Sequence, residues 1–421
     1  MAAVAERYES LVAAFDTFRA EPAFQAAHQS REWAFRRFLD SGFPTTRDEE
    51  WKFTNVAPVA GTAFVRAATA TATRADVDRF RLPGVPMLVL VNGRLSRELS
   101  ALDALPAGVT VQVTGESLGN TATGAFADLN AAFYEDFVMV KVAAHAVVDT
   151  PVHVLSLAVP GEKPAIVAPR VMFTAGEASQ CTVIEEYVGA GAGVTLTTAV
   201  TDMQVGPGAI INHVKIQRES LTAFHLASFN VQLDRASTFS SRAITLGGRI
   251  ARNDIVARLN GEGAECTLNG LYIGTGESLV DTHTTIDHAK AHCPSHELYK
   301  GILAGHSRAV FNGKIIVRPD AQKTDAKQTN KALLLSDNAQ VNTKPQLEIF
   351  ADDVKCTHGA AIGQLDDDAL FYLRARGIAE SDARHLLIEA FAREVIDGIP
   401  VEPLRAELMQ TLEAKLATPG A

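Results

Sequence analysis

Side chains that bind metals are concentrated in one stretch of the chain, residues 281–306. The stretch contains Asp281, His283, Asp287, His288, His292, Cys293, His296 and His306. Imidazole and thiolate groups suit zinc and iron, so one interpretation is a metal site. Successive residues of a strand face opposite ways, however, so these groups need not converge. The alternative is a polar loop and strand edge whose histidines bond to backbone or water.

A shorter motif, Lys355-Cys356-Thr357-His358-Gly359-Ala360, places a thiol near an imidazole. In a strand, Cys356 and His358 lie on the same face, about 7 Å apart at a rise of roughly 3.3 Å per residue. Together they could supply two ligands to iron. The alternative is a small buried cysteine beside a hydrogen-bonded histidine.

The number of cysteines limits the cluster that this chain could hold alone. Cys181, Cys266, Cys293 and Cys356 are far apart in the sequence and include no Cys-x-x-Cys pair. A 4Fe–4S cluster normally takes four protein ligands, mostly cysteine. We therefore expect the isolated chain to bind no cluster stably, and any cluster to be transient or completed by another subunit. Scattered cysteines are also typical of reduced cytoplasmic thiols rather than of a disulfide framework.

Neither sequence motifs nor composition points to an enzyme, a nucleic-acid-binding protein or a membrane protein. The glycine-rich residues 189–193 lack the spacing of a phosphate-binding loop, and no H-E-x-x-H helix occurs. The formal net charge is −10, and no run of Lys and Arg is present. No apolar run approaches the roughly 20 residues that span a bilayer. The acidic N-terminus lacks a secretory signal pattern, so we expect a non-catalytic binding or scaffold protein of the cytoplasm.

Short alternating runs, cut by recurring turns, occupy residues 150–360. The runs 210–216 and 227–233 have a period of two, which is typical of strands with one face in and one face out. Ala178, Ala209, Ala236 and Ala264 lie in similar turns and are separated by 31, 27 and 28 residues. Strand-rich repeats of this length predict a parallel β-helix, and the alternative is an antiparallel sandwich.

Helical patterns occupy both ends of the chain. Leu11, Phe15 and Phe18 recur at helical spacing near the N-terminus. Helix returns after Asp366, and these last helices could cap the solenoid or dock a partner. We therefore divide the chain into an N-terminal helical and mixed segment (1–150), a β-helix core (151–362) and a C-terminal helical domain (363–421).

Several long stretches of the chain resemble the SufB/SufD family of the Suf iron–sulfur cluster assembly machinery. They are GGRIARNDIVARLNGEGAECTLNGLYIG (247–274), DTHTTIDHAKAHCPSHELYKGIL (281–303) and RPDAQKTDAKQTNKALLLSDNAQVNTKPQLEIFADDVKCTHGAAIGQLDDDALFYLRARGI (318–378). Residues 42–54, 91–96 and 129–137 are similar to the SufD branch of the family. One departure is Phe137, where the family pattern has glycine after the acid.

The resemblance implies a mainly β protein, a right-handed parallel β-helix flanked by N-terminal and C-terminal α-helical segments. It also implies a complex with SufB and with the ABC-type ATPase SufC, in which SufB binds at the C-terminal end of the β-helix. Carried over from the family, His358 is the expected ligand to a nascent cluster shared with SufB. Cys356 is a weaker candidate for the same role.

The resemblance also implies that the C-terminal helices contact the ATPase. The expected partner-binding residues are Phe371, Tyr372, Arg374, Arg376, Leu386 and Phe391, because aromatic and arginine side chains often dominate interfaces. A homodimer is a further possibility. The competing hypotheses are a carbohydrate-active β-helix enzyme, which needs a groove with paired carboxylates, and a metalloprotein built on the histidines of 281–306.

Overall fold

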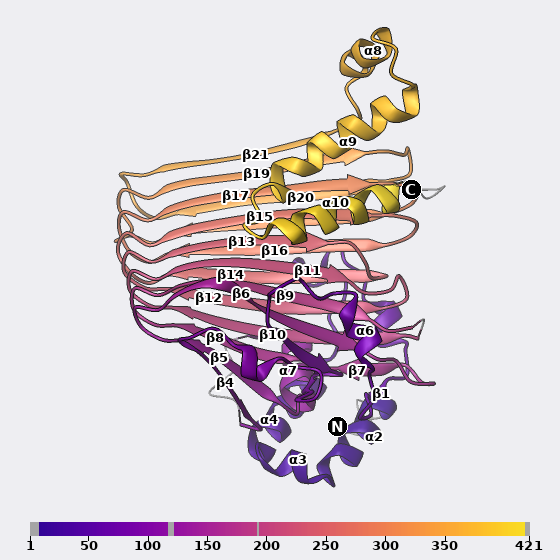
Figure 1. Cartoon of the computed structure of the whole chain (residues 1–421), viewed down its shortest axis with the longest axis vertical. Helices are drawn as coiled ribbons and strands as arrows, with labels where there is room; N and C mark the ends of the chain where they lie inside the picture. Colours follow the sequence, from indigo (N-terminus) through magenta and orange to yellow (C-terminus); the bar gives the residue numbers. More distant parts are fainter. Residues whose placement is uncertain (1–7, 117–121, 192, 417–421) are drawn as a thin grey trace.

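Two facing, mostly parallel β-sheets form the body of the protein (Figure 1). The computed structural model describes residues 8–116, 122–191 and 193–416; the first seven residues and residues 417–421, which entered the signal-peptide and domain predictions, lie outside these ranges. From β8 onward, successive strands alternate between an 11-stranded and a 10-stranded sheet, so that each coil of the chain contributes one strand to each. The pairing in this region is parallel throughout. The predicted β-helix is confirmed, and the antiparallel sandwich is wrong.

The strands of the coils are close to ten residues long and stack in register. The 11-stranded sheet contains β1 (Val65–Arg66), β4 (Val109–Thr114), β5 (Phe137–Val142), β7 (Ala165–Val167), β8 (Arg170–Ala175), β10 (Thr195–Val205), β12 (Phe224–Leu233), β14 (Ile250–Leu259), β16 (Leu279–His288), β18 (Arg308–Val317) and β20 (Gln340–Ile349). The 10-stranded sheet contains β2 (Met87–Val91), β3 (Arg94–Leu95), β6 (Val147–Ala158), β9 (Gln180–Gly189), β11 (Ile210–Arg218), β13 (Thr238–Thr245), β15 (Glu265–Gly274), β17 (Pro294–Leu303), β19 (Asp325–Leu334) and β21 (Lys355–Gly363).

One corner of each coil contains a residue in the left-handed backbone conformation. Its N–H donates to a carbonyl of the next coil, as from Ala178 to Pro207 and from Ala236 to Glu262. The corner residues are His145, Ala178, Gly208, Ala236, Gly263, His292 and Lys323, with φ between 50° and 69°. Two turns of the predicted repeat were therefore aligned one residue too late, because Ala209 and Ala264 follow the corner residue instead of occupying it.

The N-terminal segment covers one end of the solenoid and part of the outer face of the 11-stranded sheet (Figure 1). Phe15, Phe18 and Phe38 form an aromatic core that extends to Phe224 of β12. Leu11 lies in the same core, which agrees with the helical spacing seen in the sequence. The segment contains α2 (Glu9–Arg19), α3 (Pro22–Gln25), α4 (His28–Ser41), η1 (Glu49–Trp51), α5 (Ala57–Ala60), α6 (Arg74–Asp78), η2 (Leu102–Ala104) and α7 (Ala125–Phe133).

Three C-terminal helices follow β21: α8 (Asp367–Ala375), α9 (Glu380–Ile396) and α10 (Glu402–Leu416). Helices α9 and α10 pack on the outer face of the 10-stranded sheet, where Ile388, Leu404 and Leu408 belong to one hydrophobic cluster with Val214 and Ile216 of β11. They cover the side of the solenoid and leave the coil formed by β20 and β21 uncovered (Figure 1). The suggestion that these helices cap the solenoid is therefore wrong.

Candidate functional site

Strand β21 is the last strand of the 10-stranded sheet, and it contains the predicted cysteine and histidine. Cys356 pairs with Ala326 of β19, and His358 pairs with Gln328. Cys356 is half-buried and contacts the core between the sheets, whereas His358 is exposed. Because alternate residues of a strand share a face, His358 also points toward the space between the two sheets. The fold thus brings the two side chains to one face at the open end of the solenoid.

The two candidate ligands differ in their readiness to bind iron. Burial raises the pKa of the Cys356 thiol, and the charge of Asp325 adds to this effect against a backbone hydrogen bond from Ala326. Cysteine binds metals as the thiolate, which a raised pKa disfavours. A neutral imidazole binds without losing a proton, so the arrangement favours His358 as the stronger ligand. The ligand role of both residues stays a prediction.

The coil that contains these residues is the least buried part of the solenoid. Every residue of β20 is at least partly exposed, and β21 is exposed except at Cys356. Ile349, Phe350 and Ile362 present apolar side chains to solvent at this end, with Phe350 62% exposed. A strand at the end of a sheet also has unpaired backbone donors and acceptors. This end of the solenoid is therefore suited to bind another protein chain.

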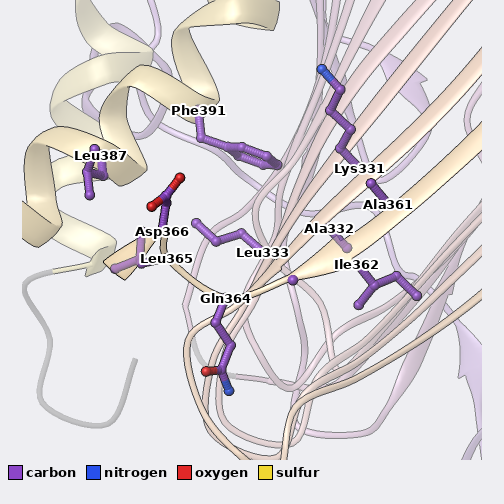
Figure 2. A pocket seen from close by; sticks show the side chains of 11 residues that line it. Lys331, Ala332, Leu333, Ala361, Ile362, Gln364, Leu365, Asp366, Leu387 and Phe391 are labelled. Carbon is purple, nitrogen blue, oxygen red and sulfur yellow. The ribbon is translucent and has the colours of Figure 1, made fainter. Parts of the chain in front are cut away.

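A groove of about 340 Å³ lies between this edge of the sheet and the C-terminal helices. Figure 2 shows the Phe391 ring of α9 extending toward the strands near Leu333 of β19, while Leu387 of the same helix lies nearer Leu365 and Asp366 of the linker that precedes α8. The Lys300 ammonium lies 4.0 Å from the centroid of the Phe391 ring and donates to the Phe391 carbonyl at 2.7 Å. Phe391 is thus held partly by contacts within the chain, whereas Leu386 on the same helix is exposed.

Helix α8 projects away from the solenoid (Figure 1) and contains no buried residue. Asp366 caps its N-terminus by accepting from the backbone N–H groups of Asp368 and Ala369. Phe371 is 73% exposed and Tyr372 56%. Of the other predicted partner-binding residues, Arg376 stacks over Tyr372 at 4.5 Å, and Arg374 pairs with Glu380 at 3.3 Å. An exposed aromatic helix of this kind is expected to gain stability by packing against a partner.

The metal-binding side chains of residues 281–306 do not converge. His288 faces the interior and contacts Ser295, and burial lowers its pKa to about 4. Asp287 binds Arg318 on the outer face, and the Cys293 thiol donates to the Gly261 carbonyl at a corner. His292, His296 and His306 are exposed on separate turns and strands. Within the described residues, no three or more His, Cys, Asp or Glu side chains are arranged to hold a metal ion.

The first two members of that stretch instead fasten the N-terminal segment to the solenoid. His283 Nε2 lies 3.1 Å from the Asp281 carboxylate, and its Nδ1 lies 3.2 Å from Glu50. Burial opposes protonation, but the two carboxylates raise the pKa of His283 to about 9. Asp281 is fully buried and also accepts from Thr54 at 2.6 Å. These residues therefore have a structural role at the junction.

A polar cluster inside the solenoid was missed by the sequence reasoning. Glu185 accepts from the hydroxyls of Tyr187 and Thr201, and His213 Nε2 lies 3.1 Å from the same carboxylate. Burial alone would raise the pKa of Glu185, but His213 and the charge of Lys215 lower it to about 2. Burial lowers the pKa of Lys215 itself to about 8. The signal was available in β11, where His213, Lys215 and Gln217 occupy alternate positions.

Comparison with known proteins agrees with this architecture. The family model "SufBD protein N-terminal region" matches residues 2–154, and the model "SUF system FeS cluster assembly, SufBD core domain" matches residues 158–391. The second model thus includes the edge strand β21 and helix α8. No helix within the described ranges is long and apolar enough to cross a lipid bilayer.

Curated relatives match along most of their length. An iron–sulfur cluster assembly SufBD family protein of Synechocystis is 34% identical over 88% of this chain and 87% of its own length. The iron–sulfur cluster assembly protein SufD of Escherichia coli is 32% identical over 90% of this chain and 91% of its own length. A chloroplastic protein of Arabidopsis thaliana, ABCI7, is 29% identical over 93% and 86%. The chain therefore belongs to the SufBD family of iron–sulfur cluster assembly proteins, as a SufD-type member.

Proposed function

We propose that this chain is a non-catalytic scaffold subunit that pairs with SufB at the open end formed by β20 and β21. In this assembly His358 supplies one ligand to a nascent iron–sulfur cluster, which is the cargo of the complex and not a resident cofactor. Helix α8 docks the SufC ATPase. The complex works in the cytoplasm, consistent with four cysteines that form no disulfide.

The observation that carries the proposal is the position of His358. It lies on the unprotected edge strand, faces the space between the sheets, and shares that face with Cys356. A partner that continues the two sheets would cover Phe350 and Ile362 and enclose His358 at the junction. An imidazole at a closed junction is well placed to hold iron together with thiolates of the second chain.

A second copy of this chain could bind at the same edge in the absence of SufB. The unpaired backbone of the edge strand and the exposed side chains of Ile349, Phe350 and Ile362 would be covered by either partner. The homodimer would bring together two His358 residues and two Cys356 thiols, and the raised pKa of Cys356 disfavours the thiolate. We therefore expect the homodimer to bind no cluster stably. The alternative function as a metalloprotein built on residues 281–306 finds no support, since those side chains are dispersed over both faces.

The test compares His358→Ala with His296→Ala during co-expression with SufB and SufC. His296 is a matched control, because it is also an exposed strand histidine of the 10-stranded sheet. Both substitutions lie at exposed positions, where stability changes usually stay within about ±0.5 kcal/mol. Size-exclusion chromatography first establishes that each variant enters the complex. Iron and sulfide content and the visible absorbance of the cluster are then measured.

We expect both variants to assemble, and only His358→Ala to lose cluster formation. Cys356→Ala should have a smaller effect, because its thiolate is disfavoured. If the His358→Ala complex assembles and forms cluster at the level of His296→Ala, the ligand role is refuted. If the chain fails to co-purify with either protein, the scaffold role in this complex is wrong.

A further inference from the structure

Three polar residues are stacked in register toward the open end of the solenoid. Glu297 of β17 pairs with Gln328 of β19, which in turn pairs with His358 of β21. All three face the space between the sheets, because they occupy the same alternating positions as Cys266, Ala326 and Cys356 in the inner core. Neighbouring parallel strands are about 4.8 Å apart. Each side chain is therefore within reach of the next.

The Gln328 amide has a hydrogen-bond partner for its nitrogen but, within the described residues, none for its oxygen. Its Nε2 donates to the Glu297 carboxylate at 2.6 Å, which fixes the orientation of the amide. The Gln328 side chain is 1% exposed, and its Oε1 has no hydrogen-bond partner in the part of the chain that the structure describes. A buried amide oxygen without a partner is costly, and native structures rarely leave one in this state.

The opposite sheet has a glycine at the position that faces this amide. Gly313 of β18 faces Gln328 across the interior, and a Cβ at position 313 would lie 2.2 Å from Gln328 Nε2 and 2.7 Å from its Cδ. The glycine has no left-handed backbone conformation that would otherwise require it. Its small size therefore serves to seat the amide directly under His358.

We propose that Gln328 is a positioning residue for His358, whose ring N–H donates to Gln328 Oε1. This inference rests on the proposed ligand role of His358 and extends it to a second layer of residues. The two residues are direct neighbours in the ladder, so the imidazole lies within reach of the amide. The bond satisfies the buried oxygen and selects one tautomer of the ring.

Selection of one tautomer determines which nitrogen of the exposed His358 ring is free to bind a metal ion. In neutral imidazole one nitrogen is a donor and the other an acceptor. When the donor nitrogen is held by Gln328, the other nitrogen presents its lone pair toward the open end, where the partner subunit would lie. Metal-binding histidines commonly donate their second nitrogen to a protein oxygen, and loss of that acceptor typically costs about 10–100-fold in metal affinity or activity.

The experiment uses Gln328→Met, which keeps the length of the side chain and removes the acceptor. Asn330→Leu is the matched control: Asn330 is also a buried, inward-facing amide of β19 and donates to the Tyr299 carbonyl, but it lies under Ala360. Gly313→Ala is a second variant that displaces the amide without removing it. The tautomer of His358 is read by nitrogen NMR of the full chain labelled with ¹⁵N-histidine. Its signal is identified by its absence in His358→Ala.

We expect one dominant His358 tautomer in the unsubstituted chain and in Asn330→Leu, and a mixture in Gln328→Met and Gly313→Ala. In the complex with SufB and SufC, cluster formation by Gln328→Met should fall by about tenfold, with Asn330→Leu unchanged. A mixture of tautomers in the unsubstituted chain overturns the inference, even if no variant folds. An unchanged tautomer in Gln328→Met overturns it as well. If the tautomer shifts but His358→Ala forms cluster normally, the ligand role fails while the hydrogen bond stands.

Discussion

Arg252 joins the N-terminal segment to the outer face of the 11-stranded sheet, and its replacement tests that junction quantitatively. Its guanidinium donates to the Asp281 carboxylate at 2.7 Å and to the Glu50 carbonyl at 2.7 Å. It also binds Asp254 and lies 3.8 Å from the centroid of the Trp51 ring. Burial alone would lower the pKa of Arg252, but the two carboxylates raise it above its ordinary value. The arginine is thus charged and fully engaged.

The Arg252→Met variant keeps the apolar stem and removes the charge. Asp281 then stays buried with only Thr54 and His283 as its partners. Removing one member of a buried ion pair costs about 3–5 kcal/mol when the remaining charge is left uncompensated; because His283 still faces Asp281, we expect a loss near the lower end, about 3 kcal/mol. With a urea dependence of about 2 kcal/mol per molar, a loss of about 3 kcal/mol should lower the unfolding midpoint of the junction by about 1.5 M.

Two spectroscopic signals separate the junction from the solenoid. The chain has two tryptophans, Trp33 and Trp51, and both belong to the N-terminal segment. Fluorescence therefore follows that segment, whereas far-ultraviolet circular dichroism follows mainly the β-strands. We expect the fluorescence midpoint of Arg252→Met to fall more than the dichroism midpoint. Arg393→Met is the control, since its pair with Glu389 lies on the surface of α9 and should leave both midpoints unchanged. An unchanged fluorescence midpoint in Arg252→Met would refute the reasoning.

Much of the fold followed from patterns that are local in the sequence. Strands β2 and β5 are examples. Both are short apolar runs next to turn residues, which is enough to identify a buried strand. The turn period of about 28 residues predicted the solenoid, because each turn marks a corner that repeats once per coil. The departure at Phe137 is accommodated by full burial of its side chain.

The assignment of faces within a strand could not be predicted from alternation alone. In β11 the apolar residues Val214 and Ile216 face outward and lie under the C-terminal helices. His213 and Lys215 face the interior, where Glu185 and Asn253 bind them. A period of two says that the faces differ, but both faces of this strand are covered. Which face is inner depends on helices that lie more than 150 residues further along the chain.

The two candidate sites also differ in how far apart their interacting residues lie in the sequence. Cys356 and His358 are two residues apart in one strand, so their common face was predictable from the strand period. The stretch 281–306 extends over two strands and two turns, and its members are divided between the interior and the outer face. One of their partners, Glu50 for His283, is more than 200 residues away in the sequence, and others, such as Arg318 for Asp287, lie one coil away. Local spacing contains no information about such contacts.

Two further predictions concern the junction and the docking helix. The pKa of His283 is raised from 6.5 to about 9, so its contribution to stability is complete below about pH 6.5 and is lost as the pH rises through 9. We expect the urea midpoint measured by fluorescence to fall over this pH range, and this fall to disappear in His283→Gln. The same pH dependence of the midpoint in both chains would contradict the assignment. On α8, Phe371→Ser should weaken SufC binding by tenfold or more, since buried aromatic contacts at interfaces are worth about 2 kcal/mol or more. Calorimetric titration with SufC measures the loss. Phe350→Ser is the control, because Phe350 is also an exposed phenylalanine but directly follows β20, at the end of the solenoid proposed to bind SufB. If both variants bind SufC like the unsubstituted chain, α8 is not the docking helix, because its exposed ring is then irrelevant to the contact.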